Sequence, residues 1–119
     1  MSRRGTVQAV HAVLPCASLA DVEELHAAIS RGEVVRHDDL YGFVVADGRE
    51  LWHLTVVDDH DPAANAAALY VHVPDPDAVH ERLSAAGHEP GPVRDEPWGM
   101  REFAVVDAAG NRIRVGRNA

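Results

Sequence analysis

The sequence has no lysine, one cysteine, two residues each of Trp, Tyr and Phe, and no long hydrophobic run. Without lysine it has no side-chain amine for a Schiff base, and without a second cysteine it has no intrachain disulfide. Cys16 lies in an apolar stretch, so we expect a small buried hydrophobe rather than a nucleophile. No apolar run approaches the roughly 20 residues of a membrane helix, and no apolar signal core follows the N-terminal arginines. We therefore expect a cytoplasmic protein that does not contact a membrane.

Charge is strongly one-sided, because 19 acidic residues stand against 11 basic ones and give a formal net charge of −8. A surface of this sign repels polyanions, so a nucleic-acid partner is not expected. It also attracts cations, so a cationic small ligand is easier to accommodate than an anionic one. On composition alone, a role of this charge in solubility is the simpler explanation.

The pattern of apolar residues and turn signals occurs twice along the chain. A chain of 119 residues has the length of one domain, which we expect to span 1–119. The repeated order predicts a first module over 6–57, a linking loop over 58–66 and a second module over 67–116. Each module is predicted to contain a strand, a helix and three further strands. The predicted strands are 6–15, 33–37, 41–46, 50–57, 67–73, 93–96, 101–106 and 112–116, and the predicted helices begin after Ser18 and Asp75.

Several short polar residues mark the turns between these elements. Asp47 and Gly48 are a strong signal for a two-residue hairpin turn, and Asp75 followed by Pro76 is typical of a helix N-terminus. Neither module is long enough to bury both faces of a sheet alone. We therefore expect an α+β fold in which two βαβββ modules pair into one curved, cleft-forming sheet domain.

The C-terminal segment carries the strongest motif, EPWGMREFAVV over 96–106 followed by the turn DAAGN over 107–111. Together with the doubled order of elements, and with Asp38, Asp39 and Gly42 in the first half, it resembles the vicinal-oxygen-chelate superfamily of glyoxalases, dioxygenases and bleomycin-resistance proteins. The resemblance covers 7–115 and is greatest to the bleomycin-resistance-type antibiotic-binding proteins. It implies the vicinal-oxygen-chelate fold, and non-catalytic sequestration of a small planar natural product that confers antibiotic resistance. The alternative it leaves open is a metal-dependent or metal-free enzyme acting on a small molecule.

The superfamily's metal site is incomplete in this chain. Its enzymes commonly place one ligand on each of four strands, and the resemblance puts these positions at His11, His53, Ala68 and Arg114. Alanine offers no ligand atom and a guanidinium repels a divalent cation. We therefore expect no metal and no cofactor, with His11 and His53 lining the cleft as hydrogen-bonded histidines. A weak metal site completed by a partner chain or a water remains the alternative.

Catalytic residues are weakly indicated by the sequence. Glu50, Asp58 and Glu102 are acid or base candidates, but a chain with 19 carboxylates offers such groups by chance. No phosphate-binding glycine loop, Cys-x-x-Cys pair or nucleophile elbow occurs. We therefore expect binding rather than catalysis.

A planar ligand needs aromatic faces and a few polar anchors in a concave site. The resemblance puts two stacking positions of the bleomycin crevice on Trp98 and Tyr70, whereas others fall on Val35 and Leu40. A planar ligand that is smaller than bleomycin or differently shaped is therefore expected. Trp98 lies between Pro97 and Gly99 in a predicted loop and should be exposed, whereas Trp52 and Phe103 should be core. The expected ligand-binding residues are Trp98, Tyr70, Tyr41, Leu40, Val35, Arg101, Glu102 and Asp38, of which only one of Arg101 and Glu102 should face the cleft.

The open sheets of this architecture leave apolar faces that one chain does not cover. We therefore expect a two-fold homodimer. The sequence leaves open whether the N-terminal strand is exchanged between its subunits.

Overall fold

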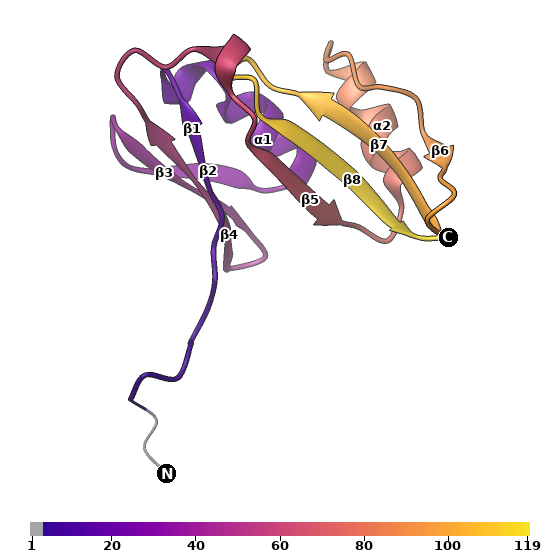
Figure 1. Cartoon of the computed structure of the whole chain (residues 1–119), viewed down its shortest axis with the longest axis horizontal. Helices are drawn as coiled ribbons and strands as arrows, with labels where there is room; N and C mark the ends of the chain where they lie inside the picture. The colour runs from indigo at the N-terminus through magenta and orange to yellow at the C-terminus, as the bar shows by residue number, and fades with distance from the viewer. Residues whose placement is uncertain (1–3) are drawn as a thin grey trace.

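The computed structural model describes residues 4–119 and contains two modules, each with a four-stranded mixed sheet and one helix on one of its faces (Figure 1). The strand orders are β1-β4-β3-β2 and β5-β8-β7-β6, so the two modules repeat one topology. This confirms the α+β fold of two βαβββ modules. The first module comprises β1 (Val13–Cys16), η1 (Leu19–Asp21), α1 (Glu23–Ser30), β2 (Glu33–Asp38), β3 (Tyr41–Ala46) and β4 (Arg49–Val56). After η2 (Pro62–Ala64), the second comprises β5 (Ala68–His72), α2 (Pro76–Ala85), β6 (Arg94–Asp95), β7 (Met100–Val106) and β8 (Arg112–Asn118).

Turn and cap residues act where the sequence predicts them. Asp47 and Gly48 have φ angles of 52° and 70°, which is the left-handed pair that a two-residue hairpin requires. The Asp75 side chain accepts a hydrogen bond from the Ala78 amide and caps α2, with Pro76 in its first turn. Ser18 makes no such bond, so a short 3-10 turn precedes α1 and this helix begins later than predicted.

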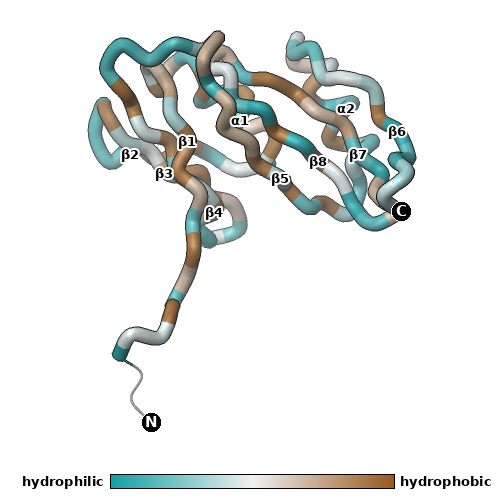
Figure 2. The backbone as a smooth tube through the Cα atoms, viewed as in Figure 1, coloured by the Kyte–Doolittle hydropathy of each residue, from teal (hydrophilic) through white to brown (hydrophobic). Residues whose placement is uncertain are grey.

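The predicted N-terminal strand is too long. Residues 6–12 lie outside β1, and the part of this segment before His11 projects away from the body of the molecule, with hydrophobic stretches along it (Figures 1 and 2). Val7 and Val10 are 73% and 84% exposed. The parallel ladder to β4 begins at Val13, opposite His53, and β4 changes register just before that point. A bulge that bends β4 away therefore explains why the pairing does not extend toward the N-terminus.

The core lies between each helix and the covered face of its sheet. Trp52 and Phe103 are buried, as predicted. Cys16 is fully buried, and burial together with nearby Asp107 raises the pKa of its thiol to about 11. The thiol therefore stays protonated and inert, as expected of a core residue. No helix within residues 4–119 is long and apolar enough to span a membrane.

A buried polar network joins the two modules. Nδ1 of His26, on α1, accepts a hydrogen bond from the Trp52 indole N–H at 2.9 Å, so the His26 Nε2–H donates to Asp107 at 2.8 Å. Asp107 lies in the turn between β7 and β8, where it also accepts from the amides of Ala109 and Asn111 and from the Asn111 side chain. The same Asn111 side chain donates to the Pro15 carbonyl of the first module. One carboxylate thus fixes a turn of the second module against a helix of the first.

Replacing Asp107 by Asn tests this network. The variant would put an amide N–H opposite two donors, so we expect the free energy of unfolding to fall by about 3 kcal/mol in urea denaturation. Asp58→Asn, an exposed loop change, is the matched control and should alter it by less than about 0.5 kcal/mol. A loss at Asp107 as small as that of the control would contradict the role of the network.

The same carboxylate makes the stability depend on pH. Burial raises the pKa of Asp107, but hydrogen bonds from His26 and Asn111 outweigh it and hold the pKa below its ordinary value of 3.8. A group whose pKa falls on folding stabilises the native state above its unfolded pKa, and this contribution is lost as the pH drops through the folded pKa. The wild type should therefore lose stability below about pH 4.

Candidate functional site

A groove of about 320 Å³ lies on the open face of the second sheet, opposite α2. In the antiparallel register of β7 and β8, Ala104 lies beside Arg114 and Val106 beside Arg112. Alternation along the strands brings these four residues and Glu102 to one face. Arg94 on the short edge strand β6 pairs with Glu102 and extends this face. The groove is thus lined mainly by β6, β7 and β8.

Trp98 stands at the groove on the loop before β7. Its indole N–H donates to a carboxylate oxygen of Glu102 at 2.6 Å, while the residue as a whole remains 60% exposed. Gly99 follows with a φ of 86°, a left-handed conformation that suits glycine and turns the chain into the strand. One edge of the ring is therefore held, and much of its planar surface stays open to a ligand. This agrees with the exposure expected from the flanking Pro97 and Gly99.

Arg101 and Glu102 lie on opposite sides of β7. Glu102 is in the groove, whereas Arg101 makes two hydrogen bonds to Asp77 of α2, at 2.8 and 2.9 Å, and one to Asp95 at 3.2 Å. These contacts raise the pKa of Arg101 and lower that of Asp77. The structure therefore places Arg101 among helix-docking contacts and outside the groove.

Tyr70 does not line the groove beside Trp98. It lines a second hollow, of about 570 Å³, between the N-terminal segment, β4 and β5. Its hydroxyl is buried over Gly116, where any side chain would collide with it, and has no hydrogen-bond partner among the described residues. Burial and the nearby charge of Glu102 raise the pKa of Tyr70, against the opposing effect of Arg114. The hydroxyl therefore remains a protonated donor at neutral pH.

The remaining expected site residues belong to the first module and do not line the Trp98 groove. Tyr41 lies with Phe43 on the open face of that sheet, and its hydroxyl is 2.7 Å from Nδ1 of His53. Val35 and Leu40 are 43% and 61% exposed. Asp38 accepts a hydrogen bond from the Leu40 amide and so shapes the turn before β3. The expected ligand residues are thus distributed over both modules and do not form one site within a single chain.

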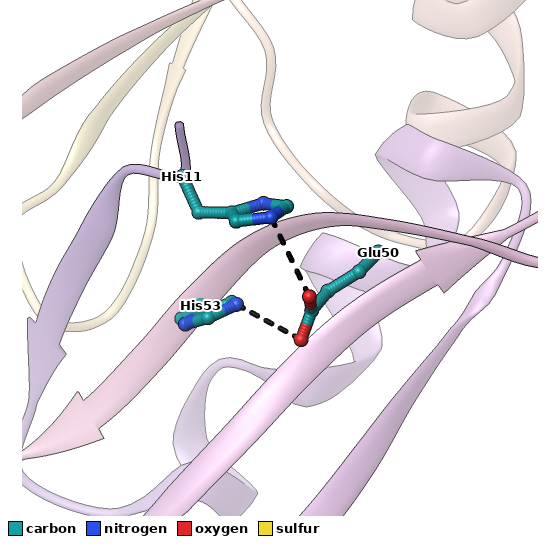
Figure 3. A group of neighbouring side chains, drawn as sticks. All are labelled: His11, Glu50 and His53. Atoms are coloured by element: carbon teal, nitrogen blue, oxygen red, sulfur yellow. Dashed lines mark ion pairs between the residues drawn. The ribbon is translucent and has the colours of Figure 1, made fainter. Parts of the chain in front are cut away.

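The first module also brings together three potential metal ligands, His11, Glu50 and His53 (Figure 3). Their ligand atoms lie within 4.8 Å of one another, and Glu50 approaches Nε2 of His11 at 3.4 Å and Nε2 of His53 at 3.1 Å. Glu50 stands three positions before His53, a spacing that would put them on opposite faces of a regular strand. However, Trp52 pairs with Val44 while Glu50 pairs with Val45, so Leu51 is an extra, bulged residue. The bulge brings Glu50 onto the face of His53.

The donor set of this cluster suits a cation. Nδ1–H of His11 donates to the Leu51 carbonyl at 3.0 Å, which leaves the Nε2 lone pair of a neutral ring facing the Glu50 carboxylate. A proton or a metal ion between the two atoms removes this repulsion. Nδ1 of His53 is likewise engaged by Tyr41. Metal-binding histidines usually have such a partner on the second nitrogen.

The four-strand ligand set of the superfamily does not fit this chain. Ala68 and Arg114, at the two second-module positions, supply no ligand. The cluster instead draws all three of its donors from one module. Sequence reasoning identified both histidines and named Glu50 as an acid or base candidate, but it did not join the three.

Solved structures with the same fold cover nearly the whole chain. One is the bleomycin-binding protein from bleomycin-producing Streptomyces verticillus, complexed with copper(II)-bleomycin. Its sequence is 25% identical, and the two structures superpose with a TM-score of 0.70 over 96% of this chain and 100% of that chain. Another is a bleomycin-binding protein complexed with bleomycin, which is 15% identical and matches with a TM-score of 0.79 over 95% of this chain and 100% of that chain. A third is a glyoxalase-related enzyme from Clostridium phytofermentans, which is 18% identical and matches with a TM-score of 0.76 over 99% of this chain and 100% of that chain.

These likenesses confirm the fold of the vicinal-oxygen-chelate superfamily that the sequence predicts. Binding proteins and enzymes both occur among the similar structures, so fold alone does not separate the two functions. No family model matches the chain, and no curated protein sequence matches it.

Proposed function

We propose that this protein binds and sequesters a small planar natural product without altering it, in the manner of bleomycin-type resistance in the cytoplasm. The observation that carries the proposal is Trp98, which Glu102 holds by its N–H while the ring stays 60% exposed at a groove of about 320 Å³. A rigid aromatic face beside a concave surface is what binding of a planar molecule requires. Bleomycin-binding proteins with this fold support the same function.

The composition of the groove favours binding over catalysis. Among the described residues, its lining contains no serine, threonine, cysteine, histidine or lysine, and its candidate nucleophiles are the carboxylates of Glu96 and Glu102. Glu102 is buried and already accepts the Trp98 N–H. Its carboxylate therefore serves first to orient the aromatic ring.

The Trp98→Ala variant tests this function. We expect it to weaken binding of a planar natural product by about 1 to 3 kcal/mol in isothermal titration calorimetry, because an exposed stacking face is lost. It should lower the free energy of unfolding by about 2 kcal/mol, since the side chain is 60% exposed and its loss removes one hydrogen bond to Glu102. Trp52→Ala, which empties a core site, should instead cost about 3 to 5 kcal/mol of stability.

The screen for this test uses bleomycin, mitomycin-class and other planar natural products. If no compound of a broad panel gives a binding heat or raises the melting temperature, the binding function is contradicted. If a compound binds the wild type and Trp98→Ala with equal affinity, its binding site is not in this groove.

We also propose that the protein is a homodimer. Exposed hydrophobic side chains occur on the N-terminal segment and on the open faces of both modules, among them Val7, Val10, Leu40 and Trp98. A second copy would cover them and bring a first-module face against a second-module groove. Sedimentation equilibrium should give twice the chain mass of 12.9 kDa, and a monomer at micromolar concentration would contradict this assembly.

The cluster of His11, Glu50 and His53 favours a second candidate function, metal-dependent chemistry in the first module. Two imidazoles and one carboxylate with open positions suit Zn²⁺ or another first-row dication, which would polarise a substrate oxygen. Ligands around tetrahedral zinc lie roughly 3.3 Å apart. The ligand atoms here lie up to 4.8 Å apart, so the exposed Glu50 side chain would have to move and one imidazole ring would have to rotate to bring them around a metal ion.

Cobalt(II) titration tests this candidate through the visible absorption of the bound ion. If the cluster binds metal, Glu50→Gln should weaken Co²⁺ binding at least about tenfold, because the charged ligand is lost. Glu33→Gln on β2, the matched control, should leave it unchanged. Identical Co²⁺ affinities for the wild type and Glu50→Gln would exclude the cluster as a metal site.

A further inference from the structure

Three arginines, Arg94, Arg112 and Arg114, line the groove beside Trp98. Among residues 4–119, none of the three has an ion pair or a side-chain hydrogen bond. The chain carries 19 carboxylates, and other arginines such as Arg36 and Arg101 do find one. Three guanidinium groups without partners therefore meet on one concave surface.

The strands hold these arginines side by side. Arg112 and Arg114 are two residues apart on β8, so they lie on the same face, roughly 7 Å from each other along the strand. Ala104 is the cross-strand neighbour of Arg114, and its small side chain leaves space in front of the guanidinium. In the parallel pair on the other side, Tyr70 neighbours Arg114, but its hydroxyl is buried over Gly116 and does not line the groove. The guanidinium groups are therefore the unused donors of this surface.

Two carboxylates, of Glu96 and Glu102, share the groove with the three arginines. Glu102 is 6% exposed and accepts the Trp98 N–H, and neither carboxylate lies within ion-pair distance of an arginine. The groove lining is therefore net positive although the chain as a whole carries −8. Guanidinium groups bind carboxylate, sulfonate and phosphate oxygens in a two-pronged geometry that an amine or amide does not offer.

We propose that the groove takes an aromatic ligand bearing an anionic group, with its ring against Trp98 and the anion on Arg112 and Arg114. This rests on the proposed binding function and names the chemical class of its ligand. The proposed ligand is anionic, whereas the net charge of the chain favours a cationic one. The long-range field of the chain attracts cations, but a bound anion is stabilised by the arginines it touches.

Three naphthalene probes of nearly equal size test this proposal: 2-naphthoate, 2-naphthamide and 2-naphthylmethylammonium. The readout is an NMR titration of the two indole N–H signals. Trp98 reports the groove, whereas Trp52 is buried against His26 and serves as an internal control. We expect naphthoate to bind at least about tenfold more tightly than either other probe and to move the Trp98 signal, because charge-assisted hydrogen bonds favour the anion. High salt should weaken naphthoate far more than naphthamide.

Two arginine variants locate the anion. Arg112→Gln and Arg114→Gln should each weaken naphthoate about tenfold while leaving naphthamide unchanged. Arg117→Gln, the same charge change on the same strand but outside the groove, is the matched control.

The outcomes separate this inference from the function on which it rests. If the ammonium probe moves the Trp98 signal with an affinity equal to or above that of naphthoate, the anionic ligand is wrong and aromatic binding in the groove stands. If the arginine variants weaken all three probes equally, the anion does not lie on them and the inference also fails. If no probe moves the Trp98 signal, both the groove and its ligand class are contradicted.

Discussion

The hydrogen bond between buried His26 and Asp107 is the constraint on which the rest of the arrangement depends. It connects α1 of the first module to the β7–β8 turn of the second, and both side chains are completely enclosed. Trp52 donates to the other nitrogen of His26, so the imidazole is neutral and its second proton points at Asp107. Since a buried carboxylate is tolerated only when its lone pairs are satisfied, this geometry sets how the two modules dock.

Docking through the helix-covered faces leaves the opposite face of each sheet open. On the second module that face carries the groove, with Trp98 fixed to Glu102 at its edge. On the first it carries Tyr41, Phe43 and the histidine cluster. One chain thus presents two chemically different surfaces, one aromatic and cationic in its lining, the other rich in imidazole. Within one chain the two proposed functions fall on separate surfaces, and the proposed dimer would bring the surface of one subunit against that of the other.

Much of this could be predicted from sequence, because it depends on local patterns. The hairpin at Asp47 and Gly48, the cap at Asp75 and the burial of Trp52 follow from turn chemistry and apolar spacing. The motif around Trp98 also predicted its exposure.

What could not be predicted depends on register between strands. The bulge at Leu51 turns Glu50 toward His53, and strict alternation would have placed them on opposite faces. Grouping Arg94 with Arg112 and Arg114 likewise requires knowing that β6 pairs with β7 and β7 with β8. Net charge, an average over the chain, conceals such a local inversion of sign.

The central claim is that the second-module groove, and not the imidazole face of the first module, holds an aromatic anion. Intermolecular nuclear Overhauser effects between bound 2-naphthoate and the protein test it most directly, since they report only contacts closer than about 5 Å, on the order of a ring-to-ring contact. The account predicts cross-peaks from the naphthalene protons to the Trp98 indole and the side chains of Arg112 or Arg114. Cross-peaks to Tyr41 and Phe43 with none to Trp98 would contradict it.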